Sequence, residues 1–236
     1  MNMDVLILCG GLGTRLREVV SDRPKPMAEF QDRPFLDLLI DYFQGFGLRR
    51  FILCTGFQAD VIQQHYTNRR DIEVVISHED SPLGTAGAIK NAESHLQSDT
   101  LLVANGDSLC RANLETFWTF HQNKQALISI LLADSDDPED YGSVGLDEDQ
   151  HIISFEEKQL GQRHAYVSAG VYLFQRKVLH YMTPEVKQSL EYDIFPQLIK
   201  VNRHCYGYTG QAAVLDIGTP QRLQRARDLL NPPQNA

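Results

Sequence analysis

Short apolar runs alternate with longer amphipathic stretches along the first half of the chain. The runs DVLIL, RFILCT, IEVVIS and TLLVAN are rich in leucine and β-branched residues and predict buried strands. The stretches between them, RPFLDLLIDYFQGFG, QADVIQQHY and GTAGAIKNAESHL, repeat apolar residues at helical spacing, and Gly47 is placed to end the first helix. Strands that alternate with helices pair in parallel through right-handed crossovers. The pattern therefore predicts an α/β fold with a Rossmann-like, doubly wound sheet that is mostly parallel.

The pattern changes after ALISILLA, which ends at Ala133. GSVGLDEDQHIISFEEK predicts a β-hairpin that turns around 147–150, and AYVSAGVYLF predicts a long strand. Helical segments are expected over 175–182 and 192–200, followed by short strands in CYGYTG and AAVLDI and by a closing helix over 220–230. The second half therefore predicts a smaller, β-rich lobe.

Neither an internal repeat nor a low-complexity linker separates the two halves. We therefore expect one domain over residues 1–230, in which a part of about 1–133 and a part of about 134–230 share one mixed sheet. The last residues, 231–236, predict a frayed tail.

Composition limits the kinds of partner. The 236 residues are 42% hydrophobic, which is enough to bury a core, and the formal net charge of -9 without a long basic run disfavours non-specific binding to nucleic acid. The N-terminus lacks a basic leader, and no segment approaches the roughly 20 apolar residues of a membrane span. Without a CxxC pair, the cysteines predict buried free thiols in a reducing compartment, namely Cys9, Cys54, Cys110 and Cys205. We expect a cytoplasmic protein that binds neither nucleic acid nor membranes.

The loop LCGGLGTRLREVVSDRPKPM follows the first predicted strand, where ligands of open parallel sheets bind. Its glycines, Gly10, Gly11 and Gly13, match neither the dinucleotide fingerprint nor the P-loop. Backbone amides of such a loop can close on phosphate, Arg15 can fork onto phosphate oxygens, and prolines on both sides fix the direction of Lys25. A tight turn that only needs positive φ angles is the alternative explanation of the glycines.

The motif GGxGTRL, followed after seven residues by PKPM, resembles the signature of the sugar-phosphate nucleotidyltransferases. Later segments match this family in the expected order over nearly the whole chain. The resemblance implies the nucleotide-diphospho-sugar transferase fold and an enzyme that joins a nucleoside triphosphate to a sugar 1-phosphate with release of pyrophosphate. It also implies that the N-terminal part binds the nucleotide and the smaller lobe binds the sugar phosphate.

Two aspartates match the positions that bind Mg²⁺ in this family, Asp107 in VANGDS and Asp216 in LDIGTP. Each also has a structural explanation, since Asp107 could cap a turn and Asp216 could mark the start of the next helix. Mg²⁺ is commonly held by one or two carboxylates together with substrate phosphates and water, which suits the pair.

The loop SHEDSPLGTAGAIKNA corresponds to the nucleobase pocket, with the backbone around Gly84 and Thr85 against the base. Glu79 could accept hydrogen bonds from both N1–H and the exocyclic amine of guanine, whereas uracil and thymine present one donor between two acceptors. This favours GTP over UTP or dTTP, although a glutamate in the acidic run HED is more often solvated. Gly87 is interpreted as a helix-packing residue.

The resemblance implies four contacts to the sugar phosphate, namely Gly142, Glu157, Lys158 and Gly170. The sequence departs from the family pattern at Gln159, where a proline is common, and at Ser168, where an asparagine is common. These departures leave the identity of the acceptor open.

Taken together, the resemblance implies the following nucleotide contacts: Leu8, Gly10, Gly11, Gly13, Thr14, Arg15, Lys25, Glu79, Gly84 and Thr85. The expected catalytic residues are Arg15, Lys25 and Asp107, with Mg²⁺ held by Asp107 and Asp216. A phosphate oxygen of the acceptor is already an anionic nucleophile, so the reaction needs alignment and charge neutralisation rather than a general base.

Overall similarity favours the short bacterial branch whose acceptor is D-glycero-α-D-manno-heptose 1-phosphate. The alternatives are a hexose 1-phosphate or N-acetylmuramate 1-phosphate with GTP, UTP or dTTP, and a sugar-nucleotide sensor without turnover. The sequence leaves the oligomeric state open. Phe117, Trp118 and Phe120 could form an interface in a homodimer, although aromatic residues on such a helix more often pack in the core.

Overall fold

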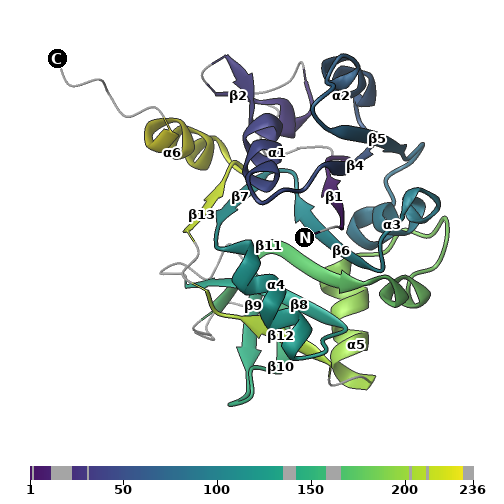
Figure 1. Cartoon of the computed structure of the whole chain (residues 1–236), viewed down its shortest axis with the longest axis vertical. Helices are drawn as coiled ribbons and strands as arrows, with labels where there is room; N and C mark the ends of the chain where they lie inside the picture. The colour runs from purple at the N-terminus through teal and green to yellow at the C-terminus, as the bar shows by residue number, and fades with distance from the viewer. Residues whose placement is uncertain are drawn as a thin grey trace.

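The computed structural model describes the fold of most of the chain. The described residues are 1, 3–11, 23–30, 32–134, 142–157, 166–201, 204–210 and 213–230. Helices lie on both sides of a central twisted sheet, and the labelled strands of both halves of the chain belong to it (Figure 1).

Nine strands form this sheet among the described residues, and seven of them follow the order β10-β9-β11-β6-β1-β4-β5. The remaining two branch from this path, because β8 pairs with both β11 and β12. The strands are β1 (Asp4–Leu8), β4 (Arg50–Thr55), β5 (Glu73–His78), β6 (Thr100–Asn105), β8 (Ile128–Asp134), β9 (Gly142–Leu146), β10 (Ile152–Glu157), β11 (Tyr166–Gln175) and β12 (Cys205–Tyr208).

The block β6-β1-β4-β5 is parallel, whereas β11 runs antiparallel to β6, β8 and β9. Two small antiparallel sheets lie apart from it. They pair β2 (Glu29–Phe30) with β3 (Arg33–Pro34), and β7 (Ser108–Arg111) with β13 (Ala213–Asp216). The predicted doubly wound, mostly parallel sheet with a β-rich second half is thus confirmed.

Six α-helices are described, and most match the predicted segments. They are α1 (Phe35–Gly45), α2 (Ala59–Tyr66), α3 (Gly84–Asn91), α4 (Leu114–Asn123), α5 (Phe195–Val201) and α6 (Pro220–Leu230). Gly47 has φ +82°, just beyond the end of α1, so its predicted role as a helix stop is confirmed.

The segment between β11 and α5 differs in detail from the prediction. Residues expected to form one helix over 175–182 form a 3₁₀ helix, η4 (Arg176–Tyr181), and a π-helical turn, η5 (Leu190–Ile194), leads directly into α5. Pro184 disfavours the helical conformation at Thr183, which accounts for the early end of the first helix. Shorter 3₁₀ turns are η1 (Lys25–Met27) and η2 (Glu93–His95).

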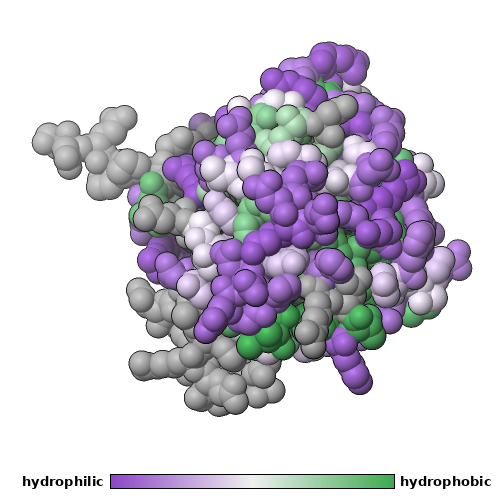
Figure 2. Space-filling view, turned by 60° about the horizontal axis from the view of Figure 1, so that its bottom comes forward, coloured by the Kyte–Doolittle hydropathy of each residue, from purple (hydrophilic) through white to green (hydrophobic). Residues whose placement is uncertain are grey.

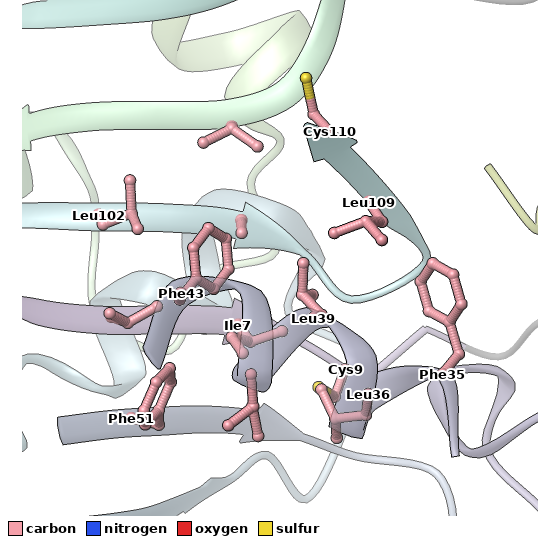
Figure 3. Close-up of a cluster of buried hydrophobic side chains, with 14 of the residues drawn as sticks. Ile7, Cys9, Phe35, Leu36, Leu39, Phe43, Phe51, Leu102, Leu109 and Cys110 are labelled. Atoms are coloured by element: carbon pink, nitrogen blue, oxygen red, sulfur yellow. The ribbon is translucent and has the colours of Figure 1, made fainter. Parts of the chain in front are cut away.

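The sheet separates two hydrophobic clusters. Successive residues of β1 point to opposite faces, so that Ile7 packs in the cluster under α1 and Leu6 packs in the cluster of α3 and α5. Figure 3 shows the first cluster, in which Leu39 and Phe43 of α1 lie over the central strands and Phe35 lies beside β7. The four cysteines are free and buried, as predicted.

One face of the molecule is largely polar where its residues are described (Figure 2). Hydrophilic residues cover most of the face in Figure 2, with hydrophobic residues in small groups between them. Phe117 is buried in the core, and Trp118 packs partly against it. A homodimer interface on α4 stays a prediction. Within the described ranges, no helix is long and apolar enough to cross a bilayer.

Candidate active site

A cleft of about 380 Å³ opens at the carboxyl ends of the parallel strands, and residues at or just after the ends of β1, β5 and β6 line it. This is where open parallel sheets bind ligands. Eight residues predicted from the sequence line it: Leu8, Gly10, Gly11, Lys25, Glu79, Gly84, Thr85 and Asp107. The fold therefore brings together loops that lie far apart along the chain.

Lys25 and Asp107 both line this cleft and form an ion pair, with 2.5 Å between Lys25 Nζ and Asp107 Oδ2. Pro24 holds an extended conformation with φ −61° and ψ 145°, and the 3₁₀ turn η1 begins directly after it. The prolines thus direct the lysine inwards, and only 13% of its side chain is exposed.

Asp216 lies beside Asp107 because β13 pairs with β7 and sets Asp216 opposite Ser108. The Ser108 hydroxyl oxygen is 3.1 Å from Asp107 Oδ1 and 3.2 Å from Asp216 Oδ2. Asp216 Oδ1 accepts hydrogen bonds from the Gly218 backbone N–H at 2.7 Å and from Arg222 at 3.1 Å. The two carboxylates are therefore close neighbours.

This pair of carboxylates suits a divalent cation. Within the part of the chain that the structure describes, no three His, Cys, Asp or Glu side chains gather as a closed metal site. Mg²⁺ does not need one, because it commonly takes one or two carboxylates and completes its shell with phosphates and water. Thr219, rather than Asp216, caps α6, since its hydroxyl accepts from the Arg222 backbone N–H at 3.3 Å.

Glu79 follows β5 and enters the cleft from the side of β4, with only 9% of the residue exposed. Its Oε2 accepts a hydrogen bond from the Leu83 backbone N–H at 3.1 Å. Burial raises the pKa of the carboxyl, because the charged form loses water. Glu79 is therefore a buried group rather than a solvated part of an acidic run.

The start of α3 is held by the segment that precedes η5. The backbone N–H groups of Ala86 and Gly87 donate to the Gln188 carbonyl at 3.0 and 3.3 Å. Gly84 has φ +72°, and a Cβ there would lie 2.5 Å from the same carbonyl oxygen. A Cβ on Gly87 would lie 2.8 Å from the Val186 carbonyl oxygen, consistent with its predicted packing role.

The contact between α3 and Gln188 also places the preceding residue, Lys187, at the edge of the cleft. Lys187 is exposed, and the sequence pattern did not predict it as a site residue. It belongs to no motif, and only the fold of the second half of the chain brings it to the cleft. Asn105 and Gly218 also line the cleft. Asn105 packs against the predicted Gly170, and the Gly218 N–H donates to the predicted Asp216.

Of the predicted acceptor residues, the three that the structure describes, Gly142, Glu157 and Gly170, are not among the residues that line the cleft. Gly142 and Glu157 are opposite each other in the β9–β10 hairpin. Gly170 has φ +70° and does not line the cleft; a Cβ on it would lie 2.7 Å from the side-chain nitrogen of Asn105, which does. Four predicted residues lie outside the described part of the chain: Gly13, Thr14, Arg15 and Lys158.

Comparisons with known proteins identify the family of the chain. The family model described as nucleotidyl transferase matches residues 4–231. The D-glycero-alpha-D-manno-heptose 1-phosphate guanylyltransferase of Aneurinibacillus thermoaerophilus is 33% identical over 226 residues, which cover 95% of this chain and 97% of that protein. The mannose-1-phosphate guanylyltransferase of Mycobacterium tuberculosis is 33% identical over 94% of this chain, which spans 63% of that longer protein.

Solved structures give the same result. The crystal structure of HddC from Yersinia pseudotuberculosis complexed with GMP-PN superposes on this chain with a TM-score of 0.83 and 33% sequence identity. The superposition covers 96% of this chain and 99% of the HddC chain. A putative glucose-1-phosphate thymidylyltransferase from Bacillus anthracis shares the fold, with a TM-score of 0.85 and 22% identity. The family resemblance inferred from the loop motif is confirmed, and the chain belongs to the nucleotidyl transferase family.

Proposed function

We propose that this protein is a sugar-1-phosphate guanylyltransferase, which joins GTP to a sugar 1-phosphate and releases pyrophosphate. The observation that carries the proposal is a single cleft lined by a buried glutamate, a directed lysine and Asp107, whose carboxylate has Asp216 as its neighbour through Ser108. The first acceptor to test is D-glycero-α-D-manno-heptose 1-phosphate, because a relative of nearly the same length carries that name.

The reaction is an in-line displacement at the α-phosphorus. An oxygen of the acceptor phosphate attacks, the bond to the β-phosphate breaks, and pyrophosphate leaves with the electron pair. Lys25 exchanges its partner Asp107 for the equatorial oxygens of the α-phosphate, where negative charge must be stabilised. The acceptor oxygen is already anionic, so no side chain has to remove a proton.

Other residues position the substrates. The loop of Gly10 and Gly11 lies against the triphosphate, and Arg15 binds its outer phosphates. Lys158 and Glu157 hold the acceptor phosphate and sugar. Asp107 and Asp216 would hold Mg²⁺, whose chemistry is to neutralise the charge of the triphosphate.

The base is guanine in this proposal because of Glu79. One oxygen of its carboxylate accepts from Leu83, and the remaining acceptor sites can take N1–H and the exocyclic amine. A buried carboxylate left without these donors is unfavourable, so nucleotides that lack them should be used less well.

A hexose acceptor is the second candidate. The mycobacterial relative is named for mannose 1-phosphate and matches at the same 33% identity. Both candidates use the same cleft and the same displacement, and they differ only in the acceptor contacts.

The test is pyrophosphate release with GTP, UTP, dTTP, ATP and CTP against heptose, mannose, glucose and N-acetylmuramate 1-phosphates. GTP should be preferred, and chelation of Mg²⁺ should stop turnover. Lys25→Ala should lower kcat by about 10²- to 10³-fold. The matched control is Lys177→Ala, an exposed lysine of η4. Turnover of Lys25→Ala near that of the control would remove Lys25 from the mechanism.

A further inference from the structure

The ends of three parallel strands place two glycines beside Glu79. Leu8 of β1 is in register with Cys54 of β4, and Cys54 is in register with Ser77 of β5. Two residues further along each strand stand Gly10, Gly56 and Glu79. The backbone continues this alignment past the strands, since the Glu79 N–H donates to the Thr55 carbonyl at 2.8 Å.

The glutamate side chain fills the space that the two glycines leave. A Cβ on Gly10 would lie 2.6 Å from Glu79 Oε1. A Cβ on Gly56 would lie 2.9 Å from the same oxygen and 3.1 Å from Glu79 Cγ. Neither glycine has a positive φ, so it is this contact, and not the backbone conformation, that requires the missing side chain.

We infer that Gly56 is a specificity-determining residue, because its missing Cβ lets the Glu79 carboxylate lie in the cleft where it reads the guanine base. The inference rests on the proposed function, in which Glu79 accepts hydrogen bonds from guanine. Gly56 itself does not line the cleft and acts only through Glu79. A methyl group on Gly56 would displace the carboxylate, since the end of a flexible side chain gives way more easily than the backbone.

The experiment compares GTP with ITP, whose base keeps N1–H and lacks the exocyclic amine. The ratio of their kcat/KM values is measured on one preparation, so that the fraction of folded enzyme cancels. The parent protein should prefer GTP by about tenfold or more, the usual size of one hydrogen bond to a charged group. Gly56→Ala should bring the ratio close to one.

Two further variants define the cause. Glu79→Ala should lower the ratio as much as Gly56→Ala, and the double variant should show no additional loss, because the methyl group then meets no carboxylate. The matched control is Gly45→Ala at the exposed end of α1, where a Cβ would meet nothing within 4 Å. The control should keep the parent ratio.

The outcomes separate this inference from the proposed function. A ratio that falls in Glu79→Ala and is unchanged in Gly56→Ala would overturn the role of Gly56 and leave guanine recognition intact. An equal loss from Gly56→Ala with or without the Glu79 side chain would also overturn it, because the effect would then pass through the Gly10 carbonyl, 3.1 Å from the new Cβ. A parent protein without GTP preference would refute the base assignment and the inference together.

Discussion

Individual residues that line the cleft are buried at a cost to the stability of the fold. Glu79 illustrates this, because its carboxylate is buried and the Leu83 N–H is its one hydrogen-bond donor within the described residues. Burial raises its pKa, and this effect outweighs the opposing effects of Leu83 and of the nearby His78. A neutral side chain would lose less hydration in the same space, so the buried carboxylate agrees with the proposed role of Glu79 in base recognition.

Glu79→Gln should raise the melting temperature at neutral pH while it lowers GTP use. A raised pKa means that the folded state binds the proton more tightly than the unfolded state, so the ionised group destabilises the fold as pH rises above its ordinary value of 4.5. The gain should therefore vanish near pH 4. Melting curves from pH 4 to 8 test this, with the exposed Glu115→Gln as control; a gain that persists at pH 4 would contradict it.

At the scale of elements, polar contacts as well as the core join α2 to α1. Asp37 on α1 is 7% exposed and accepts from Tyr66 at 2.7 Å and from His65 at 3.0 Å. Arg69, just after α2, reaches Asp37 at 3.4 Å and Asp41 at 2.9 Å. Burial raises the pKa of Tyr66, which keeps its hydroxyl a donor to this carboxylate.

Asp37→Ala should accordingly lower the free energy of unfolding by about 3 kcal/mol, because it leaves buried partners without an acceptor. Asp41→Ala, which removes a more exposed carboxylate of the same cluster, should cost less than about 1 kcal/mol. Urea unfolding measures both values. Equal losses in the free energy of unfolding for the two substitutions would show that the burial of Asp37 does not set the contribution of this cluster to stability.

At the scale of the whole molecule, one sheet carries both halves of the chain. β11 pairs with β6 of the first half and with β8 and β9 beyond it, and β12 returns to pair with β8. His121 of α4 is fully buried against β8, where its Nδ1 lies 2.8 Å from the Ser129 hydroxyl. Burial lowers the pKa of His121 from 6.5 to about 4.

Stability should therefore fall as the pH drops from 6.5 to about 4. Between these pH values the unfolded chain binds a proton at His121, whereas the folded protein keeps this histidine neutral. The free energy of unfolding should therefore decrease by on the order of 3 kcal/mol across this range. His121→Gln should have a flatter profile over the same range. Urea unfolding of both proteins at several pH values tests this, and parallel profiles would contradict it.

Much of the fold could be predicted because local periodicity reports it directly. Short apolar runs and helical spacing located β1, β4, β5 and β6 and the helices between them, and the loop motif singled out Lys25, which lines the cleft. The segment around η5 was less predictable, because its π-helical turn depends on contacts with α3 that lie far away in the sequence.

The sequence by itself determined the element pattern, the family and most of the residues that line the cleft. Only the tertiary structure decided which of them meet. The β7–β13 pairing brings Asp216 to Asp107, the return of the second half brings Lys187 to α3, and strand register sets Gly56 beside Glu79. These contacts depend on which strand ends lie side by side and in which register, and that information is carried by long-range pairing rather than by neighbours along the chain.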